Sequence, residues 1–195
     1  MLIFGHLGVG SKLVSPWTRQ LPLRAVLLGT LLPDLIDKPL YFGMALATGR
    51  TSSEIGLVSC SRTFGHTAIF MTLIALAALA RRSKVLAAVA LGVASHLFLD
   101  NLSDRFQANS TGSALIAMLW PFLDTRFAEM PVHSLDDYAE RAFTPFLVGG
   151  EIAGLGILSW DLWKRRYESE IIAFFKERRQ MLKRFRRSRR QKRQD

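Results

Sequence analysis

Apolar residues gather along this chain in uninterrupted blocks and do not alternate with polar ones. The blocks cover residues 25–36, 63–80, 85–99 and 142–160. The block at 63–80 has no Asp, Glu, Lys or Arg across 18 residues, and the block at 142–160 has only Glu151 across 19. The alternation typical of half-buried strands is nearly absent, so the pattern predicts an all-α protein, a polytopic membrane helical bundle or a buried helical core.

Prolines, glycines and polar stretches separate these blocks. They predict helix breaks at Pro33 and Pro39, a polar loop at 49–62, a tight turn at 81–84, and a charged loop at 124–141 with a short helix after Ser134. The turn at 81–84 (Arg-Arg-Ser-Lys) therefore folds the second block back on the third.

Block length alone does not separate a membrane protein from a soluble one, because a crossing helix needs about 20 apolar residues. Charge placement favours the membrane. If the turn at 81–84 is cytoplasmic, nineteen basic residues fall on that side and six on the other, as the positive-inside rule requires. This count holds only if residues 113–123 do not cross. We therefore expect a multi-pass plasma membrane protein.

The net charge of +10 belongs entirely to the end of the chain. Residues 164–195 carry 14 Lys/Arg and 4 Asp/Glu, whereas residues 1–163 are neutral. Apolar residues recur there at three- and four-residue steps, which predicts a basic amphipathic helix on the anionic cytoplasmic leaflet. We expect a membrane-embedded domain at 1–163 and a cytoplasmic tail at 164–195. Nucleic-acid binding by the tail is the less favoured interpretation, because no nucleic-acid fold is recognisable.

Histidines and aspartates lie at the ends of the apolar blocks, where one fold would bring them together. Asp34 and Asp37 close the first block, His66 opens the second, and His96 and Asp100 close the third. Folding back at 81–84 puts all five at one end, away from the arginines of the turn. His6 joins them if the first dozen residues pack alongside.

Imidazoles mixed with carboxylates are the donors that Zn²⁺, Mn²⁺ or Fe²⁺ bind. The pattern predicts a metal site that activates water, with Asp34, Asp37 and Asp100 as catalytic carboxylates and an unligated one as general base. Any single one of these residues, taken alone, is better explained as a helix cap or an interfacial group, so the prediction depends on their convergence. His133 lies in a charged loop and is predicted to be a surface residue.

The ordered set His6, Leu31-Leu-Pro-Asp34-Leu-Ile-Asp37-Lys-Pro, Gly65-His66-Thr67, Ser95-His96-Leu-Phe-Leu-Asp100 and Leu119-Trp-Pro-Phe122 resembles the YdjM-like family of membrane-bound metal-dependent hydrolases. The resemblance covers about residues 1–126 and implies a polytopic inner-membrane protein. The metal ligands it implies are His6, Asp34, Asp37, His66, His96 and Asp100, with Zn²⁺ as the first candidate ion. Lys38 stands where many relatives have histidine, so one or two ions are expected.

The same order of ligand types is distantly similar to the all-helical zinc-dependent phospholipase C and nuclease group, which implies a phosphodiester or lipid-linked substrate. Two other functions remain open from the residues. A non-catalytic membrane scaffold would recruit cytoplasmic partners through its basic tail, and a transporter would use Glu151 in an ion path. A carboxylate inside an apolar segment is otherwise a group satisfied by a neighbour.

Overall fold

The computed structural model describes residues 3–49, 60–106, 113–128 and 144–164. Its helices are the π-helix η1 (Gly5–Gly10), α1 (Ser11–Val14), α2 (Leu23–Thr48), the 3-10 helix η4 (Phe64–His66), α3 (Ala68–Ala80), α4 (Lys84–Phe106), α5 (Ser113–Met118) and a helix over Pro145–Lys164. These residues contain no strand, which confirms the all-α prediction. The chain divides into two units, Met1–Ile157 and Leu158–Asp195, and only residues 158–164 of the second are described.

Helix α2 runs unbroken for 26 residues through Pro33 and Pro39, so the predicted breaks at these prolines are wrong. A proline inside a helix removes one hydrogen bond, and packing against α4 compensates for the loss. Gly29 of α2 and Gly92 of α4 let the two helices approach closely, because a Cβ at either position would overlap the backbone of the other helix. Close approach at small residues is typical of helix pairs in membranes.

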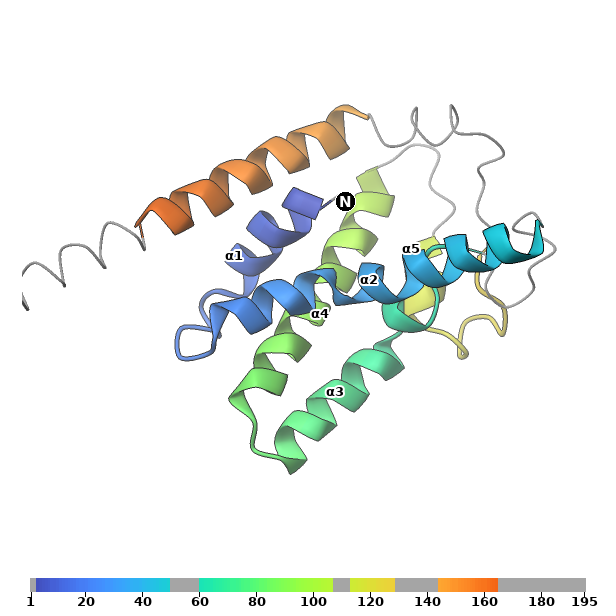
Figure 1. Ribbon diagram of the computed structural model, residues 1–195, viewed down its shortest axis with the longest axis horizontal. Helices are drawn as coiled ribbons and strands as arrows, with labels where there is room; N and C mark the ends of the chain where they lie inside the picture. Colours follow the sequence, from blue (N-terminus) through green and yellow to red (C-terminus); the bar gives the residue numbers. More distant parts are fainter. Residues whose placement is uncertain (1–2, 50–59, 107–112, 129–143, 165–195) are drawn as a thin grey trace, which may run out of the picture. The chain divides into compact units, whose positions relative to one another are not determined.

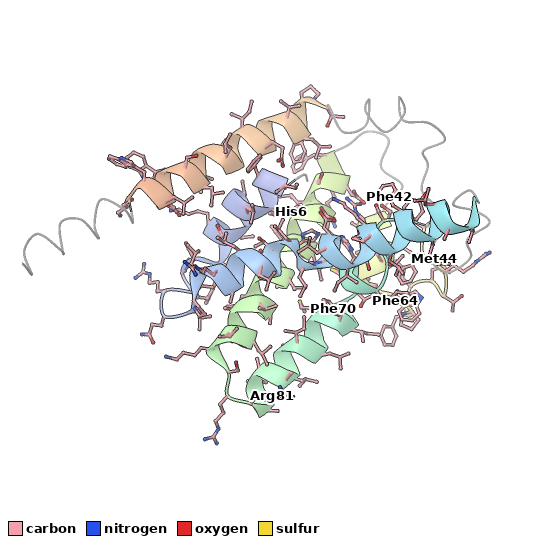
Figure 2. The ribbon with its side chains drawn as sticks, viewed as in Figure 1. His6, Phe42, Met44, Phe64, Phe70 and Arg81 are labelled. Atoms are coloured by element: carbon pink, nitrogen blue, oxygen red, sulfur yellow. The ribbon has the colours of Figure 1, made fainter. Side chains whose placement is uncertain are left out.

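The turn predicted at 81–84 is confirmed. Helix α3 ends at Ala80, Arg82 adopts a left-handed conformation with φ of 47°, and α4 begins at Lys84. Figure 1 shows α3 and α4 running back beside each other from this turn, and Figure 2 places Arg81 there. Because the hairpin folds back, the start of α3 and the end of α4 share one end of the molecule.

Two helices, Lys84–Phe106 and Pro145–Lys164, are long and apolar enough to cross a membrane by length and composition. Helix α3 has only 13 residues and measures about 20 Å, shorter than a hydrocarbon core of about 30 Å. Its outward leucines Leu73, Leu76 and Leu79 are 55–74% exposed, as on a helix that faces lipid. Helix α5 has six residues and is too short to cross, as the charge count requires.

Parts of the sequence predictions fall on residues that the structure does not describe. These are the middle of the polar loop (50–59), the short helix expected after Ser134, and the amphipathic tail beyond Lys164. They stay predictions.

Candidate metal centre

Three histidines and two aspartates from four elements meet beside the α2–α4 contact. His6 comes from η1, Asp34 from α2, His66 from η4, and His96 and Asp100 from α4. The histidines are at most 1% exposed and Asp100 is 3% exposed. These are five of the six residues that the sequence singles out, and the sixth, Asp37, contacts the His66 ring.

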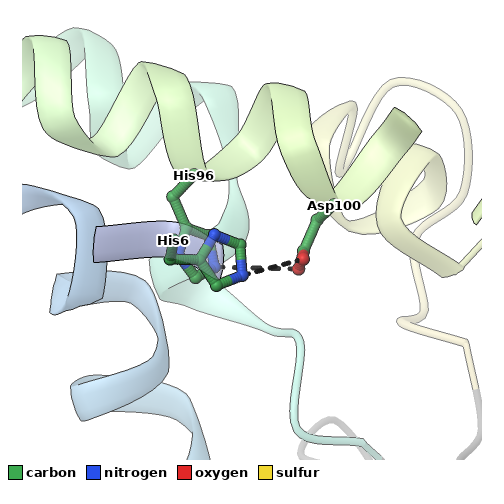
Figure 3. A group of neighbouring side chains, drawn as sticks. All are labelled: His6, His96 and Asp100. Atoms are coloured by element: carbon green, nitrogen blue, oxygen red, sulfur yellow. Dashed lines mark ion pairs between the residues drawn. The ribbon is translucent and has the colours of Figure 1, made fainter. Parts of the chain in front are cut away.

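The ligand atoms of these residues form two overlapping sets of three, each within 4.8 Å. One set is His6, His96 and Asp100, drawn in Figure 3; the other is Asp34, His66 and His96. His66 Nε2 is 3.1 Å from His96 Nε2, and His6 Nε2 is 3.2 Å from Asp100 Oδ1. Donors bound to one Zn²⁺ at about 2.1 Å in a tetrahedron lie about 3.4 Å apart. The observed spacings therefore suit a shared cation.

Hydrogen bonds behind the cluster fix which nitrogens of His66 and His96 face inward. His96 Nδ1 is 2.7 Å from the carbonyl oxygen of Thr30, which can only accept, so Nδ1 carries the proton. His66 Nδ1 is likewise 2.7 Å from Asp37 Oδ2 and donates to it. In the neutral rings both Nε2 atoms then present lone pairs to each other at 3.1 Å. Such a pair of nitrogens needs a proton or a metal ion to share, and outer hydrogen bonds of this kind are typical of metal-binding histidines.

His6 is the least satisfied member of the cluster. Its ring stacks on His96 with centroids 3.8 Å apart and planes 15° apart. Neither ring nitrogen has a hydrogen-bond partner in the part of the chain that the structure describes, although both are buried. Its Nε2 lies near Asp100 without being aligned for a hydrogen bond. Buried polar atoms are nearly always paired, so an ion at this place would satisfy nitrogens that the protein leaves without a partner.

A proton on His66 Nε2 can also bridge the two facing nitrogens of His66 and His96. Burial by itself lowers the pKa of His66, but its hydrogen bonds to Asp34 and Asp37 raise that pKa above the ordinary value. A proton on Nε2 and a divalent ion therefore compete for the same atom. Metal affinity must fall as the pH is lowered through the raised pKa of His66.

Asp37 differs from the other predicted ligands, because neighbouring donors engage both of its oxygens. It accepts from the backbone N–H groups of Thr63, Gly65 and His66 at 2.7–3.2 Å, as well as from the His66 ring. Gly65 leaves little space here, since a Cβ would lie 3.0 Å from the carbonyl oxygen of Pro33. Asp37 belongs to neither set of three. Its hydrogen bonds hold η4, and His66 with it, against α2.

Asp34 is the most accessible acid of the cluster, with its side chain 14% exposed. Its Oδ1 lies 3.6 Å from His66 Nε2, and its Oδ2 pairs with Lys38 Nζ at 2.7 Å. Lys38 is thus the counter-ion of Asp34.

Arg62 also belongs to this site, although no motif in the sequence marks it. Its Nε is 3.1 Å from Asp100 Oδ2, and its Nη1 binds Asp104 Oδ1 at 2.9 Å. Burial lowers the pKa of Arg62, but Asp100 and Asp104 outweigh it and raise the pKa above its usual value. The guanidinium therefore holds one oxygen of Asp100 and leaves the other facing His6. The expected cluster contains three aspartates and no positively charged side chain. This excess of negative charge is the feature of the sequence that could have indicated a nearby arginine or lysine.

Cys60 packs beside Arg62 and takes no part in either set. Burial raises the pKa of its thiol to about 11, so the thiol stays protonated at neutral pH.

Fold and site together define a helical protein with apolar helices of membrane-spanning length and a buried His/Asp cluster that could hold a metal ion. The chain belongs to the YdjM inner membrane protein family, whose model matches residues 1–173. This match confirms the resemblance seen in the sequence and identifies an inner membrane protein. No curated protein and no solved structure matches the chain.

Proposed function

We propose that this protein is a polytopic inner-membrane, metal-dependent hydrolase. His6, Asp34, His66, His96 and Asp100 hold one or two divalent ions, with Zn²⁺ as the first candidate and Mn²⁺ or Fe²⁺ as alternatives. The observation that carries the proposal is the pair of Nε2 lone pairs of His66 and His96 facing each other at 3.1 Å beside the unpaired nitrogens of His6. A proton on His66 satisfies only one of these contacts, whereas an ion satisfies them together.

The chemistry divides among the residues by their exposure and contacts. An ion held here supplies a Lewis acid that polarises the scissile group and acidifies water. Asp34 is the most exposed of the proposed ligand carboxylates, so it would hold the ion on the side that water reaches. Asp37 holds His66 in its tautomer, and Arg62 holds Asp100. We therefore assign orienting roles to Asp37 and Arg62 and a ligand role to Asp34.

A cavity that reaches Asp104, the second partner of Arg62, supports a lipid-linked phosphodiester as the substrate. It has a volume of about 640 Å³ between α3, α4 and α5, and most of its lining is apolar, including Met71, Phe98 and Leu115. Asp104 lines the cavity and pairs with Arg62, which pairs with Asp100 of the cluster. The cavity is in the size range of small-molecule sites. We propose that an acyl or prenyl chain of the substrate occupies this cavity.

The topology that we propose puts the site on the non-cytoplasmic side. Asp100 is 16 residues beyond Lys84 on α4, which separates the cluster from the basic turn by about 24 Å along the helix. That distance approaches the thickness of a hydrocarbon core. With the turn in the cytoplasm, the tail at 164–195 lies on the anionic cytoplasmic leaflet.

Metal content tests the proposal directly. We expect the purified protein, loaded with Zn²⁺ or Mn²⁺ and passed through gel filtration, to retain at least about one equivalent, because a preformed buried site holds its ion. The same preparation should hydrolyse a phosphodiester with a lipid chain, and a chelator should abolish the activity. Retention below about a tenth of an equivalent would rule out the metal site. Retention without hydrolysis, on all lipid-linked phosphodiesters tried, would indicate a structural metal.

The role of Asp37 is tested by Asp37→Asn. We expect metal affinity to fall about 10–100-fold, the usual cost of losing an outer hydrogen-bond partner, because the amide no longer holds His66 in one tautomer. Isothermal titration with Zn²⁺ measures the change. Asp124→Asn is the matched control, since Asp124 bonds only its own loop at Arg126 among the described contacts. Equal affinities for the two variants would show that Asp37 does not orient the ligand.

A further inference from the structure

Glu151 contacts the first turn of the helical segment that carries His6. Its two carboxylate oxygens accept from two backbone N–H groups, Oε2 from Phe4 at 2.8 Å and Oε1 from Gly5 at 2.8 Å. Residues 3–14 are continuously helical, so these N–H groups belong to a first turn that has no helical acceptors of its own. A carboxylate is also the favoured charge at this end of a helix.

The same two segments touch along their backbones. Gly8 of η1 faces Gly154, one turn beyond Glu151, and a Cβ on Gly8 would overlap the carbonyl of Gly154. A Cβ on Gly154 would overlap the carbonyl of Phe4. Two glycines and a bidentate carboxylate therefore fix the position of η1 along the helix that begins at Pro145.

His6 follows directly after Gly5, whose N–H binds Glu151, and its ring enters the cluster without any hydrogen bond of its own. His66 and His96 are held by Asp37 and by the Thr30 carbonyl. His6 has no such partner on its ring among the described residues. Its placement depends on the backbone, and a π-helical turn is a device often found at functional sites.

We propose that Glu151 is a positioning residue for the metal centre. Because it accepts hydrogen bonds from the backbone N–H groups of Phe4 and Gly5, it places His6 Nε2 opposite Asp100. The inference rests on the proposed function, since it concerns the metal site. It assigns the one carboxylate of the apolar block at 142–160 to the assembly of that site, and it explains why this acid lies in an apolar helix. An ion path through Glu151, as in the transporter alternative, is therefore not needed to explain a carboxylate at this position.

A double-mutant cycle in full-length, detergent-purified protein tests this role, with Co²⁺ as the probe. Co²⁺ affinity and the visible Co²⁺ spectrum are measured for wild type, Glu151→Ala, His6→Ala and the double variant. If Glu151 acts through His6, Glu151→Ala should weaken Co²⁺ about 10-fold or more in wild type and alter the spectrum as His6→Ala does. In the His6→Ala background the same change should have little further effect, because coupled residues are not additive.

Controls separate this result from general damage. Ile152→Ala removes an adjacent side chain that is 68% exposed, and it should leave affinity and spectrum unchanged. Glu151→Gln keeps one acceptor but points an NH₂ group at the other N–H, so it should lie between wild type and Glu151→Ala. This variant serves in the cycle if Glu151→Ala does not fold.

The outcomes are distinct. Equal loss of affinity from Glu151→Ala in both backgrounds overturns the positioning role, as does a Glu151→Ala protein indistinguishable from wild type. Wild-type protein that binds no Co²⁺, Zn²⁺ or Mn²⁺ overturns the proposed function and, with it, the role of Glu151 in it.

Discussion

Protein carrying both His66→Ala and His96→Ala should be purified almost free of metal. His96 Nε2 belongs to both sets of candidate ligands and His66 Nε2 to one, so the double change leaves neither set complete. Loss of an outer hydrogen-bond partner costs metal sites about 10–100-fold; loss of two ligands should cost more, beyond about 100-fold. Metal analysis after gel filtration and titration with Zn²⁺ measure the effect.

The fourth histidine provides the control for this double variant. His133→Ala removes an imidazole that the sequence predicts to be on the surface, and it should leave the metal content unchanged. A scaffold that acts through its tail predicts the opposite pattern. Its phenotype would survive loss of His66 and His96 but not deletion of residues 164–195. Double-variant protein that keeps a full equivalent of metal would contradict the assigned ligands.

The meeting of these residues could be predicted because the sequence places polar groups at the ends of apolar blocks. Once the turn at 81–84 reverses the chain, the start of α3 and the end of α4 must share an end. His66 and His96 therefore meet through topology alone, without knowledge of side-chain packing. The same argument brings in Asp34 and Asp37, since α2 packs along α4.

The division of labour between Asp34 and Asp37 could not be predicted. The two residues are three positions apart on one helix and share a face. They differ because η4 and the preceding residue Thr63 offer three backbone N–H groups to Asp37, whereas Lys38 is the partner of Asp34. That distinction depends on how η4 docks onto α2, which no local pattern encodes.

Long-range packing also decides the features that the sequence analysis missed. Helix α2 continues through two prolines because tertiary contacts outweigh the local preference to break. The position of His6 depends on Glu151, 146 residues away from Gly5. Arg62 joins the site by pairing with Asp100, and its second partner, Asp104, is 42 residues away. Each of these contacts is specific in space and has no period or spacing in the sequence.

Gly92→Ala should separate α2 from α4 and unfold the site. The new Cβ would overlap the Val26 carbonyl and lie within 2.8 Å of backbone atoms of Gly29 and Thr30. Backbone cannot rotate away as a side chain can, so we expect a cost of about 3 kcal/mol or more, at the upper end for overpacked cores. Thr30 holds His96 through its carbonyl, and metal should therefore be lost together with stability.

Gly43→Ala is the matched control, because Gly43 also lies inside α2 and a Cβ there meets nothing within 4 Å. Alanine has the higher helix propensity by about 1 kcal/mol, so this variant should be at least as stable as wild type and keep its metal. Thermal unfolding in detergent, followed by circular dichroism, compares the two. Equal stability of Gly92→Ala and Gly43→Ala would show that α2 and α4 do not approach closely. The hydrogen bond between His96 Nδ1 and the Thr30 carbonyl, which requires this approach, could then not orient His96.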